Sequence, residues 1–239
     1  METLDFEYEF SFDDGTSQKF SIQIDAKLLV VKDDPNYRPP DWTLLEFKQC
    51  GNCPYSVNEK KHCPVALGLA RVAESFRGET SHRETTVTVR GPSRLYQKRT
   101  DVQIGLQSLF GLTMGASDCR HMDLFKPMVQ FHLPFATFDE TIIRVIGNYL
   151  VEEYLRIQDH RAGTADLELE GLKEAYRQVN LVNQGMINRI RAVAKGDADR
   201  NAIIILDSFA SLLPLELEGE KSVLRRVFLK EGAEQKESA

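Results

Sequence analysis

The sequence lacks any long apolar run. Nowhere in its 239 residues does an apolar stretch approach the roughly 20 residues that span a bilayer. The N-terminus, METLDFEYEF, is acidic and alternates polar with apolar residues, which is the opposite of a secretory signal. We therefore expect a cytoplasmic protein that is not a membrane protein.

Several catalytic motifs are also missing. The chain contains no G-x-x-x-x-G-K-[ST] phosphate loop, no G-x-G-x-x-G after a strand, no H-E-x-x-H and no G-x-S-x-G. Nucleotide hydrolysis, dinucleotide redox chemistry, zinc proteolysis and α/β-hydrolase chemistry therefore lack their usual residues. The sequence also contains neither internal repeats nor low-complexity stretches.

Positive charge is in short supply, with a net charge of −6. Basic residues do gather in one interval, at Arg71, Arg77, Arg83, Arg90, Arg94, Lys98 and Arg99. Phosphate binding needs clustered Lys and Arg side chains, whereas an interval of this kind is more often a solvated face. Nucleic-acid binding through Arg71–Arg99 is accordingly the weakest of the functional hypotheses.

The N-terminal residues predict a β-hairpin. Apolar side chains alternate with polar ones on both sides of Asp13-Asp14-Gly15, at Leu4, Phe6, Tyr8, Phe10, Phe12, Phe20, Ile22 and Ile24. Period-two alternation around a glycine-containing turn is typical of a hairpin. Further extended segments are expected at Leu28–Val31, Trp42–Phe47 and Thr85–Val89.

Helices are expected later in the chain. Pro64 suits the first turn of a helix, because its missing N–H is harmless there, and Gly78 would end that helix. The spacings Thr100-x-x-Gln103 and Thr137-x-x-Glu140 are those of capping boxes. From Thr100 onward we therefore expect mainly helix.

Apolar residues at near-heptad spacing predict a long helix at about 166–195, and a shorter one is expected at about 200–213. The apolar stripe of the long helix is expected to bury against its own core by default, or against a second copy in a homodimer. Strands early and helices late favour an α+β fold.

We expect one α+β domain over residues 1–239. Its parts would be a β-rich segment at 1–49, a cysteine loop with mixed structure at 50–135, helices at 136–229 and a frayed tail at 230–239.

The four cysteines of the chain predict a metal centre. Cys50 and Cys53 have the C-x2-C spacing of a metal knuckle, Cys63 follows ten residues later, and Cys119 lies far away in sequence. Tetrahedral zinc accepts a ligand from a distant element, since it requires only that each sulfur come within about 2.3 Å. Cys50, Cys53, Cys63 and Cys119 are therefore the candidate metal ligands, with zinc as the expected metal.

Other interpretations of the cysteines remain open. Four cysteines also serve iron–sulfur clusters, which makes such a cluster the alternative cofactor. Disulfides are disfavoured in a reducing cytosol, and buried unlinked cysteines would act as small hydrophobes. His62 and His121 adjoin two of the cysteines as substitute nitrogen ligands or, more simply, as hydrogen-bonded histidines. A redox-active C-x-x-C is not favoured, because Pro54 and a loop follow it in place of a helix.

A second unusual segment follows Cys119. Its residues are Phe125-Lys126-Pro127-Met128 and Phe131-His132-Leu133-Pro134-Phe135, and they accompany Cys50-x-x-Cys53-Pro54 and His62-Cys63-Pro64. With these motifs the sequence resembles a family of uncharacterised bacterial proteins from Leu45 to Leu155. The resemblance implies that the cysteines and the His-Leu-Pro-Phe turn belong together, and it implies no activity or ligand. The family pattern often has proline where this chain has Arg120.

Asp123, Lys126 and His132 are candidates for a small polar site, since a histidine beside a carboxylate is the minimum for acid–base catalysis. Their spacing does not require them to meet. The simpler interpretation is that Pro127 kinks or ends a helix, that Phe131, Leu133 and Phe135 pack beneath a turn, and that His132 is a hydrogen-bonded core residue.

These observations favour a non-enzymatic binding or adaptor protein with structural zinc and an unidentified protein partner. The alternative is a metal-dependent or iron–sulfur enzyme with its site between Cys119 and His132.

Overall fold

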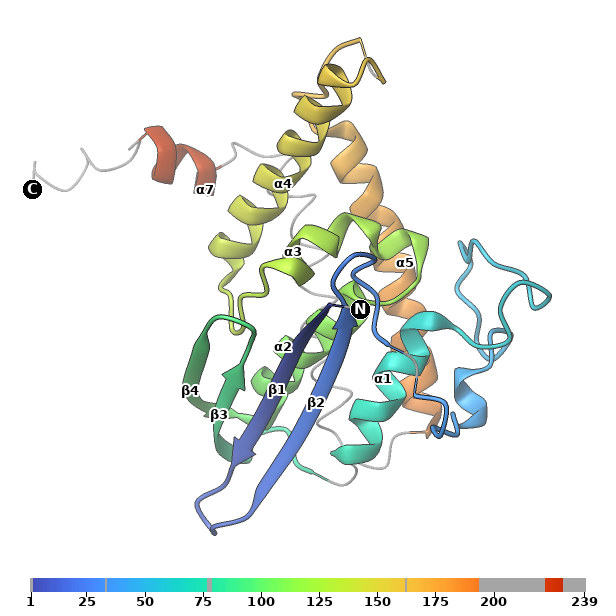
Figure 1. The fold of residues 1–239 in the computed structure, drawn as a ribbon, viewed down its shortest axis with the longest axis vertical. Helices are drawn as coiled ribbons and strands as arrows, with labels where there is room; N and C mark the ends of the chain where they lie inside the picture. Colours follow the sequence, from blue (N-terminus) through green and yellow to red (C-terminus); the bar gives the residue numbers. More distant parts are fainter. Residues whose placement is uncertain (1, 33, 77–78, 162, 194–221, 230–239) are drawn as a thin grey trace, which may run out of the picture.

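The computed structural model describes residues 2–32, 34–76, 79–161, 163–193 and 222–229 (Figure 1). A four-stranded antiparallel sheet is built from the first half of the chain, and most of the helical residues follow it. The predicted α+β fold is thereby confirmed. The helix expected at about 200–213 and the tail at 230–239 lie outside the described residues.

The predicted hairpin is present as β1 (Thr3–Ser11) and β2 (Ser17–Asp25). Its register places Tyr8 opposite Phe20. In β1 the even-numbered side chains Phe6, Tyr8 and Phe10 are buried, because successive side chains of a strand point to opposite faces. The turn uses Gly15, whose φ of 83° suits glycine.

Two later strands complete the sheet in the order β2-β1-β3-β4. The segment expected at Thr85–Val89 is β3 (Glu84–Arg90), and it pairs with β1. The sequence analysis missed β4 (Leu95–Asp101), which lies at the edge of the sheet. Most of its side chains are exposed, so it carries no buried alternation by which to recognise it.

Two of the expected extended segments are not strands. Leu28–Val31 forms a turn with a single bridge from Val31 to Ile24, because Leu29 adopts a φ of 54°, which a strand does not permit. Trp42–Phe47 begins in the 3-10 turn η1 (Asp41–Thr43) and continues as turns. The prediction of strands at these two places was wrong.

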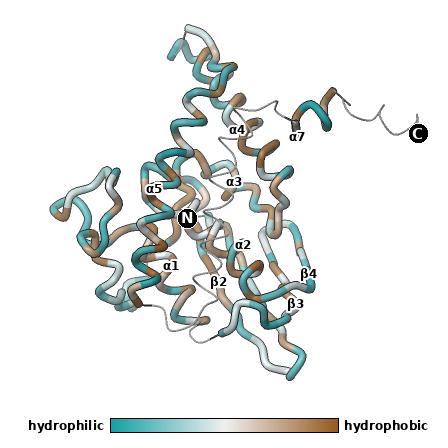
Figure 2. Tube along the Cα trace, turned by 180° about the vertical axis from the view of Figure 1, so that it is seen from behind, coloured by the Kyte–Doolittle hydropathy of each residue, from teal (hydrophilic) through white to brown (hydrophobic). Residues whose placement is uncertain are grey.

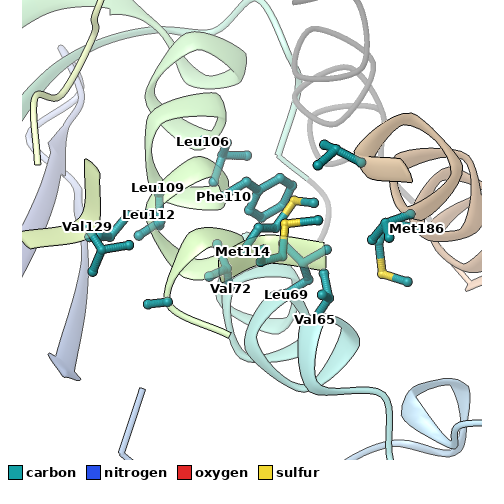
Figure 3. Close-up of a cluster of buried hydrophobic side chains, with 14 of the residues drawn as sticks. Val65, Leu69, Val72, Leu106, Leu109, Phe110, Leu112, Met114, Val129 and Met186 are labelled. Atoms are coloured by element: carbon teal, nitrogen blue, oxygen red, sulfur yellow. The ribbon is translucent and has the colours of Figure 1, made fainter. Parts of the chain in front are cut away.

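Helices α1 (Pro64–Ser75) and α2 (Val102–Gly115) pack on one face of the sheet (Figure 1). Figure 3 shows apolar side chains of both helices gathered in one cluster, which includes Leu69 of α1 and Phe110 of α2. The two helices approach closely at Gly68, where an added Cβ would lie 2.5 Å from Thr113 Cγ2. As predicted, Pro64 stands in the first turn of α1.

The start of α2 differs from the prediction. Its N-cap is Asp101, whose carboxylate accepts a hydrogen bond of 3.1 Å from the Ile104 amide. Thr100 remains in β4. The helix begins one residue later than the Thr100–Gln103 capping box would place it, because pairing with β3 holds Thr100 in extended backbone.

A 3-10 segment η2 (Arg120–Phe125) follows α2 and leads into α3 (Lys126–Gln130). Pro127 stands in the first turn of α3. The prediction that it kinks or ends a helix was therefore wrong. Phe131 is 70% exposed and does not pack beneath the turn. Helix α4 (Phe138–Gln158) begins with the predicted capping box, in which Thr137 and Glu140 bond each other's backbone amides.

Helix α5 (Glu170–Val193) lies beside α4, and the tip that joins them is mostly hydrophilic (Figures 1 and 2). The apolar side of α5 is buried in the common core, at Leu172, Tyr176, Val179, Val182, Met186 and Ile190. The stripe therefore packs against its own chain, and the homodimer remains an untested prediction. A short helix α7 (Ser222–Leu224) and the π turn η3 (Arg225–Leu229) are the last described elements.

None of the helices among the described residues is both long enough and apolar enough to cross a membrane.

Candidate metal centre

The four cysteines come from three places in the fold. Cys50 and Cys53 lie in the loop after η1, Cys63 is the N-cap of α1, and Cys119 is the N-cap of η2. Cys63 and Cys119 are each 6% exposed, while Cys50 and Cys53 are half-buried. All four contact the same hydrophobic core.

A turn gives the first pair its knuckle shape, since the Cys53 amide donates to the Cys50 carbonyl at 3.1 Å. Between them, Asn52 fixes the knuckle to two other elements. Its carbonyl accepts a hydrogen bond of 2.8 Å from His121 Nε2 of η2, and its Nδ2 donates to the Gln178 carbonyl of α5 at 3.0 Å. The knuckle is therefore held beside Cys119.

The rest of the loop is tied to the residues just before η2. Tyr55 donates its hydroxyl proton to the Asp118 carbonyl at 2.9 Å, and Lys60 forms an ion pair of 2.5 Å with the Asp118 carboxylate. Both contacts involve the residue just before Cys119. They bring the far side of the cysteine loop to the same point in the fold.

The thiols are close enough to affect one another's pKa. Burial is the main cause that raises the pKa of Cys50 to about 12, and negative charge on Cys63, Cys53 and Cys119 contributes to this increase. Burial likewise raises the pKa of Cys119 to about 11, with smaller increases from Cys63 and Cys53. All four sulfurs thus lie within electrostatic range of one another.

Backbone amides at two helix starts oppose this effect of burial. The amides of Ala66 and Val65 lower the pKa of Cys63, although burial leaves it raised overall. The amide of His121 acts in the same way on Cys119. Amides of this kind stabilise a thiolate, because they present the positive end of the peptide dipole to it.

Arg189 of α5 is the most unusual neighbour of the sulfurs. It is 1% exposed, and its guanidinium donates to the carbonyls of Trp42, Leu44 and Leu45 at 2.7–2.8 Å. Its Nε has no hydrogen-bond partner among the described residues.

No described carboxylate forms an ion pair with Arg189. Burial lowers its pKa, and negative charge on Cys63, Cys50 and Cys53 would raise it again. The cysteines are therefore the groups able to balance this buried cation.

Gly185 lies one helical turn before Arg189 and allows the loop to approach α5. A Cβ at this position would lie only 2.5 Å from Cys50 Sγ, a separation at which one of the two must shift. The contact places the Cys50 sulfur directly against the helix that carries Arg189.

Each of the two neighbouring histidines forms a hydrogen bond within the protein through one ring nitrogen. His121 bonds the Asn52 carbonyl, and His62 Nδ1 lies 2.8 Å from Thr43 Oγ1. Both therefore fit the hydrogen-bonded interpretation. All four cysteines are free thiols. Within the part of the chain that the structure describes, no group of three or more His, Cys, Asp or Glu side chains is placed so that it could hold a metal ion as it stands.

Asp123, Lys126 and His132 do not form one site. Lys126 donates to the carbonyls of Leu29 and Ser117 at 2.9 and 2.8 Å, which is a structural role. Burial raises the pKa of Asp123, and Lys126 partly offsets the increase. His132 lines a cavity whose described lining does not include Asp123.

His132 belongs to a hydrogen-bonded chain beneath the sheet. Its Nε2 lies 2.5 Å from the hydroxyl of Tyr8, which lies 2.9 Å from Ser108 Oγ. Burial lowers the pKa of His132 to about 3. It is therefore neutral at pH 7 and a poor general base, as the simpler interpretation of this residue predicted.

Acidic partners neutralise much of the basic interval. Arg83 pairs with Glu79 and Asp14, Arg90 with Glu7 and Glu9, and Arg99 with Asp13 and Glu84. These guanidinium groups face carboxylates, mostly from the hairpin. They leave little free positive charge for phosphate.

Sequence reasoning missed Arg189, Asn52 and Gly185. Arg189 is one of many charges on an amphipathic helix, and its burial follows only from the way α5 docks. Asn52 and Gly185 belong to common residue types in unremarkable positions. The C-x2-C spacing around Asn52 was the one available signal.

Together these elements define an α+β protein with an antiparallel sheet on one side and a cysteine cluster between a loop and two helical segments on the other. The chain belongs to the family described as a domain of unknown function (DUF6901), whose model matches residues 6–228. Membership of an uncharacterised family is thus confirmed, over more of the chain than Leu45–Leu155. No curated protein and no solved structure matches the chain.

Proposed function

We propose that Cys50, Cys53, Cys63 and Cys119 bind one zinc ion as a structural centre in a non-enzymatic binding protein. The observation that supports the proposal is the electrostatic proximity of four thiols from distant parts of the sequence. Binding requires the sulfurs to move closer together than they stand, and to release their protons as metal-bound thiols do.

Arg189 supports a thiolate centre in particular. One Zn²⁺ ion with four thiolates carries a net charge of −2, and a buried guanidinium with an unpaired Nε lies beside the sulfurs. A buried charge is expensive unless it is balanced. The metal–thiolate group would provide that balance, and it would give Nε an acceptor.

The composition of the ligand set supports a structural role over a catalytic one. Four cysteines complete a tetrahedral zinc site and leave no position for water, whereas catalytic zinc keeps one open. The centre would fasten the 50–63 loop to η2 and α5. These two elements also line a cavity on their other side.

Elemental analysis of protein purified without oxygen tests this proposal. We expect about one zinc per chain in the wild type, and loss of the metal on Cys119→Ser, which leaves the C-x2-C pair intact. Ser56→Ala, in the same loop, is the control that should retain zinc. Brown, iron-containing protein would show that the cysteines hold an iron–sulfur cluster and not zinc. Metal-free protein that fails to take up added Zn²⁺ would overturn the proposal.

Arg189 provides a second, independent test. Arg189→Met keeps most of the side-chain volume but removes the charge and the donors to the three carbonyls. We expect a lower Tm and weaker zinc retention against a chelator. Arg191→Met, at an exposed site on the same helix, should change neither. Unaltered zinc retention in Arg189→Met would remove the charge-balance argument.

A further inference from the structure

A cavity of about 360 Å³ lies between α2, the α3–α4 segment and α5. An engineered apolar cavity of about 150 Å³ is large enough for benzene, and small-molecule sites begin at about 300 Å³. The space therefore fits a small organic molecule. The cysteines do not appear in its described lining.

The walls of the cavity are mainly apolar. Methionine and aromatic side chains contribute much of the surface, at Met114, Met122, Met128, Phe125, Phe135 and Phe138. Methionine is flexible and polarisable, so it adapts to ligands of varied shape. Such walls favour an aliphatic or aromatic body over a sugar or a nucleotide.

The rim of the cavity carries positive charge. Lys98 and Thr137 are exposed and mark the opening, with half-buried Arg144 nearby in the lining. Arg144 donates to the Phe131 carbonyl at 2.6 Å. Glu140 lies within electrostatic range of both cations, but it is also engaged in the cap of α4. Two cations against one carboxylate leave a net attraction for an anion.

The inner wall contains an unpaired polar group. Asn183 of α5 is 2% exposed and lines the cavity, and its Oδ1 has no hydrogen-bond partner among the described residues. An unsatisfied buried polar group destabilises the folded protein, so a ligand that pairs with it gains affinity. Figure 1 draws α5, which carries Asn183, and β4, which carries Lys98, on opposite sides of α2. The unpaired oxygen and the exposed cation therefore belong to opposite walls of the cavity.

We propose that this cavity binds an amphipathic organic acid with a hydrogen-bond donor at its far end. The carboxylate would lie at Lys98 and Arg144, the apolar body between the methionine and phenylalanine side chains, and a hydroxyl group would donate to Asn183 Oδ1. The inference names a ligand class for the binding role proposed above. Its failure is distinguishable from failure of the zinc proposal, because loss of ligand binding would leave the zinc content of the purified protein unchanged.

Calorimetric titration of the purified full chain with three ten-carbon probes tests the inference. We expect 10-hydroxydecanoate to bind more tightly than either of the other probes, because decanoate lacks the far-end hydroxyl and 1-decanol lacks the carboxylate. Decanoate should bind more tightly than 1-decanol, because hydrogen bonds to a charged group are the stronger ones. Lys98→Ala should weaken both acids and leave 1-decanol unaffected. Lys27→Ala, exposed and outside the cavity lining, is the matched control.

Asn183→Leu separates the far-end contact from the rest. We expect the preference for 10-hydroxydecanoate over decanoate to fall about tenfold, as loss of a buried hydrogen bond predicts. The Tm of the free protein should rise, because the buried, unpaired Oδ1 is gone. Absence of binding by all three probes, or binding that neither Lys98→Ala nor Asn183→Leu alters, would overturn the inference. If Asn183→Leu does not fold, the Lys98 comparison decides alone.

Discussion

Burial sets the protonation states in the hydrogen-bonded chain of Tyr8, Ser108 and His132. A histidine in a cavity is an obvious candidate for proton transfer, yet the low pKa of His132 keeps the ring neutral. The same burial raises the pKa of the Tyr8 hydroxyl, which therefore stays protonated. Both groups can exchange hydrogen bonds, but neither is suited to carry charge at neutral pH.

Acid should destabilise the fold through His132. In the unfolded chain a histidine protonates below about 6.5, whereas folded His132 resists protonation down to about 3. The stabilisation is complete above about pH 6.5 and is lost as the pH falls from there toward 3, by up to about 1.4 kcal/mol per unit. Urea unfolding between pH 7.5 and 5 measures this slope.

His132→Gln is the informative variant for that experiment, since its amide oxygen can accept from Tyr8 but does not titrate. The slope between pH 6.5 and 5 should become smaller. His160→Asn changes an exposed histidine and should retain the wild-type slope. Equal slopes in all three proteins would show that His132 does not set the acid sensitivity.

At the scale of helices and strands, the sequence predicts an element well where burial leaves a periodic trace. The β1–β2 hairpin and helices α4 and α5 have such traces and were predicted. Strand β4 is held at the sheet edge by its backbone pairing with β3. Its mostly exposed side chains therefore show no alternation of apolar and polar residues from which a strand could be predicted. Trp42–Phe47 looks extended, but it adopts a turn whose carbonyls meet Arg189 from a distant helix.

The candidate site was predictable to a similar degree. Four cysteines suggested a common centre, and the structure places the four thiols within electrostatic range of one another. None of the described His, Cys, Asp or Glu side chains are grouped in threes as a metal site, so the centre itself remains a prediction. Arg189 and Asn183 could not be found in the same way. Their importance depends on which face of α5 turns inward, and each is polar on a face where the pattern of apolar residues has gaps.

The start of α2 gives a direct test of which residue caps that helix. Asp101→Ala removes the carboxylate that accepts from Ile104, and loss of such a cap costs about 0.5–2 kcal/mol. Thr100→Ala should cost less, because Thr100 belongs to β4. Chemical denaturation of the two variants ranks them. A larger loss of stability in Thr100→Ala would show that Thr100 caps the helix, as expected from the sequence.

Gly185 and Gly147 form a matched pair for testing how the loop docks on α5. Both are glycines within helices, where alanine normally stabilises by about 0.5–1 kcal/mol. Nothing lies within 4 Å of a Cβ at Gly147, whereas Cys50 Sγ lies at 2.5 Å from one at Gly185. We expect Gly147→Ala to raise the Tm, and Gly185→Ala to lower it and to weaken zinc retention. A higher Tm in both variants would mean that the cysteine loop shifts to accommodate the added methyl group without loss of stability.

At the scale of the whole molecule, α5 and η2 each serve two sites. Tyr176, Val179 and Asn183 line the cavity, while Gly185 and Arg189 meet the cysteine loop. In η2, Met122 and Phe125 line the cavity, while Cys119 precedes them. Any force that moves these elements on the cysteine side therefore alters the shape of the cavity.

Metal removal should consequently weaken ligand binding. Chelation of zinc would release the loop from η2 and α5, and the affinity for 10-hydroxydecanoate should fall by about 5–150-fold if the two sites couple with the usual 1–3 kcal/mol. Titrations of metal-loaded and chelated protein measure the factor. The effect must be reciprocal, so that ligand slows the loss of zinc. Equal affinities in both forms would leave the two sites independent.

The placement of Arg189 also bears on the order of events during synthesis. All four cysteines belong to the first half of the chain, so they leave the ribosome well before α5 does. At the zinc centre proposed above, a metal ion would therefore be captured while α5 is still being translated. Arg189 would then bring its positive charge to a group whose negative charge is already assembled.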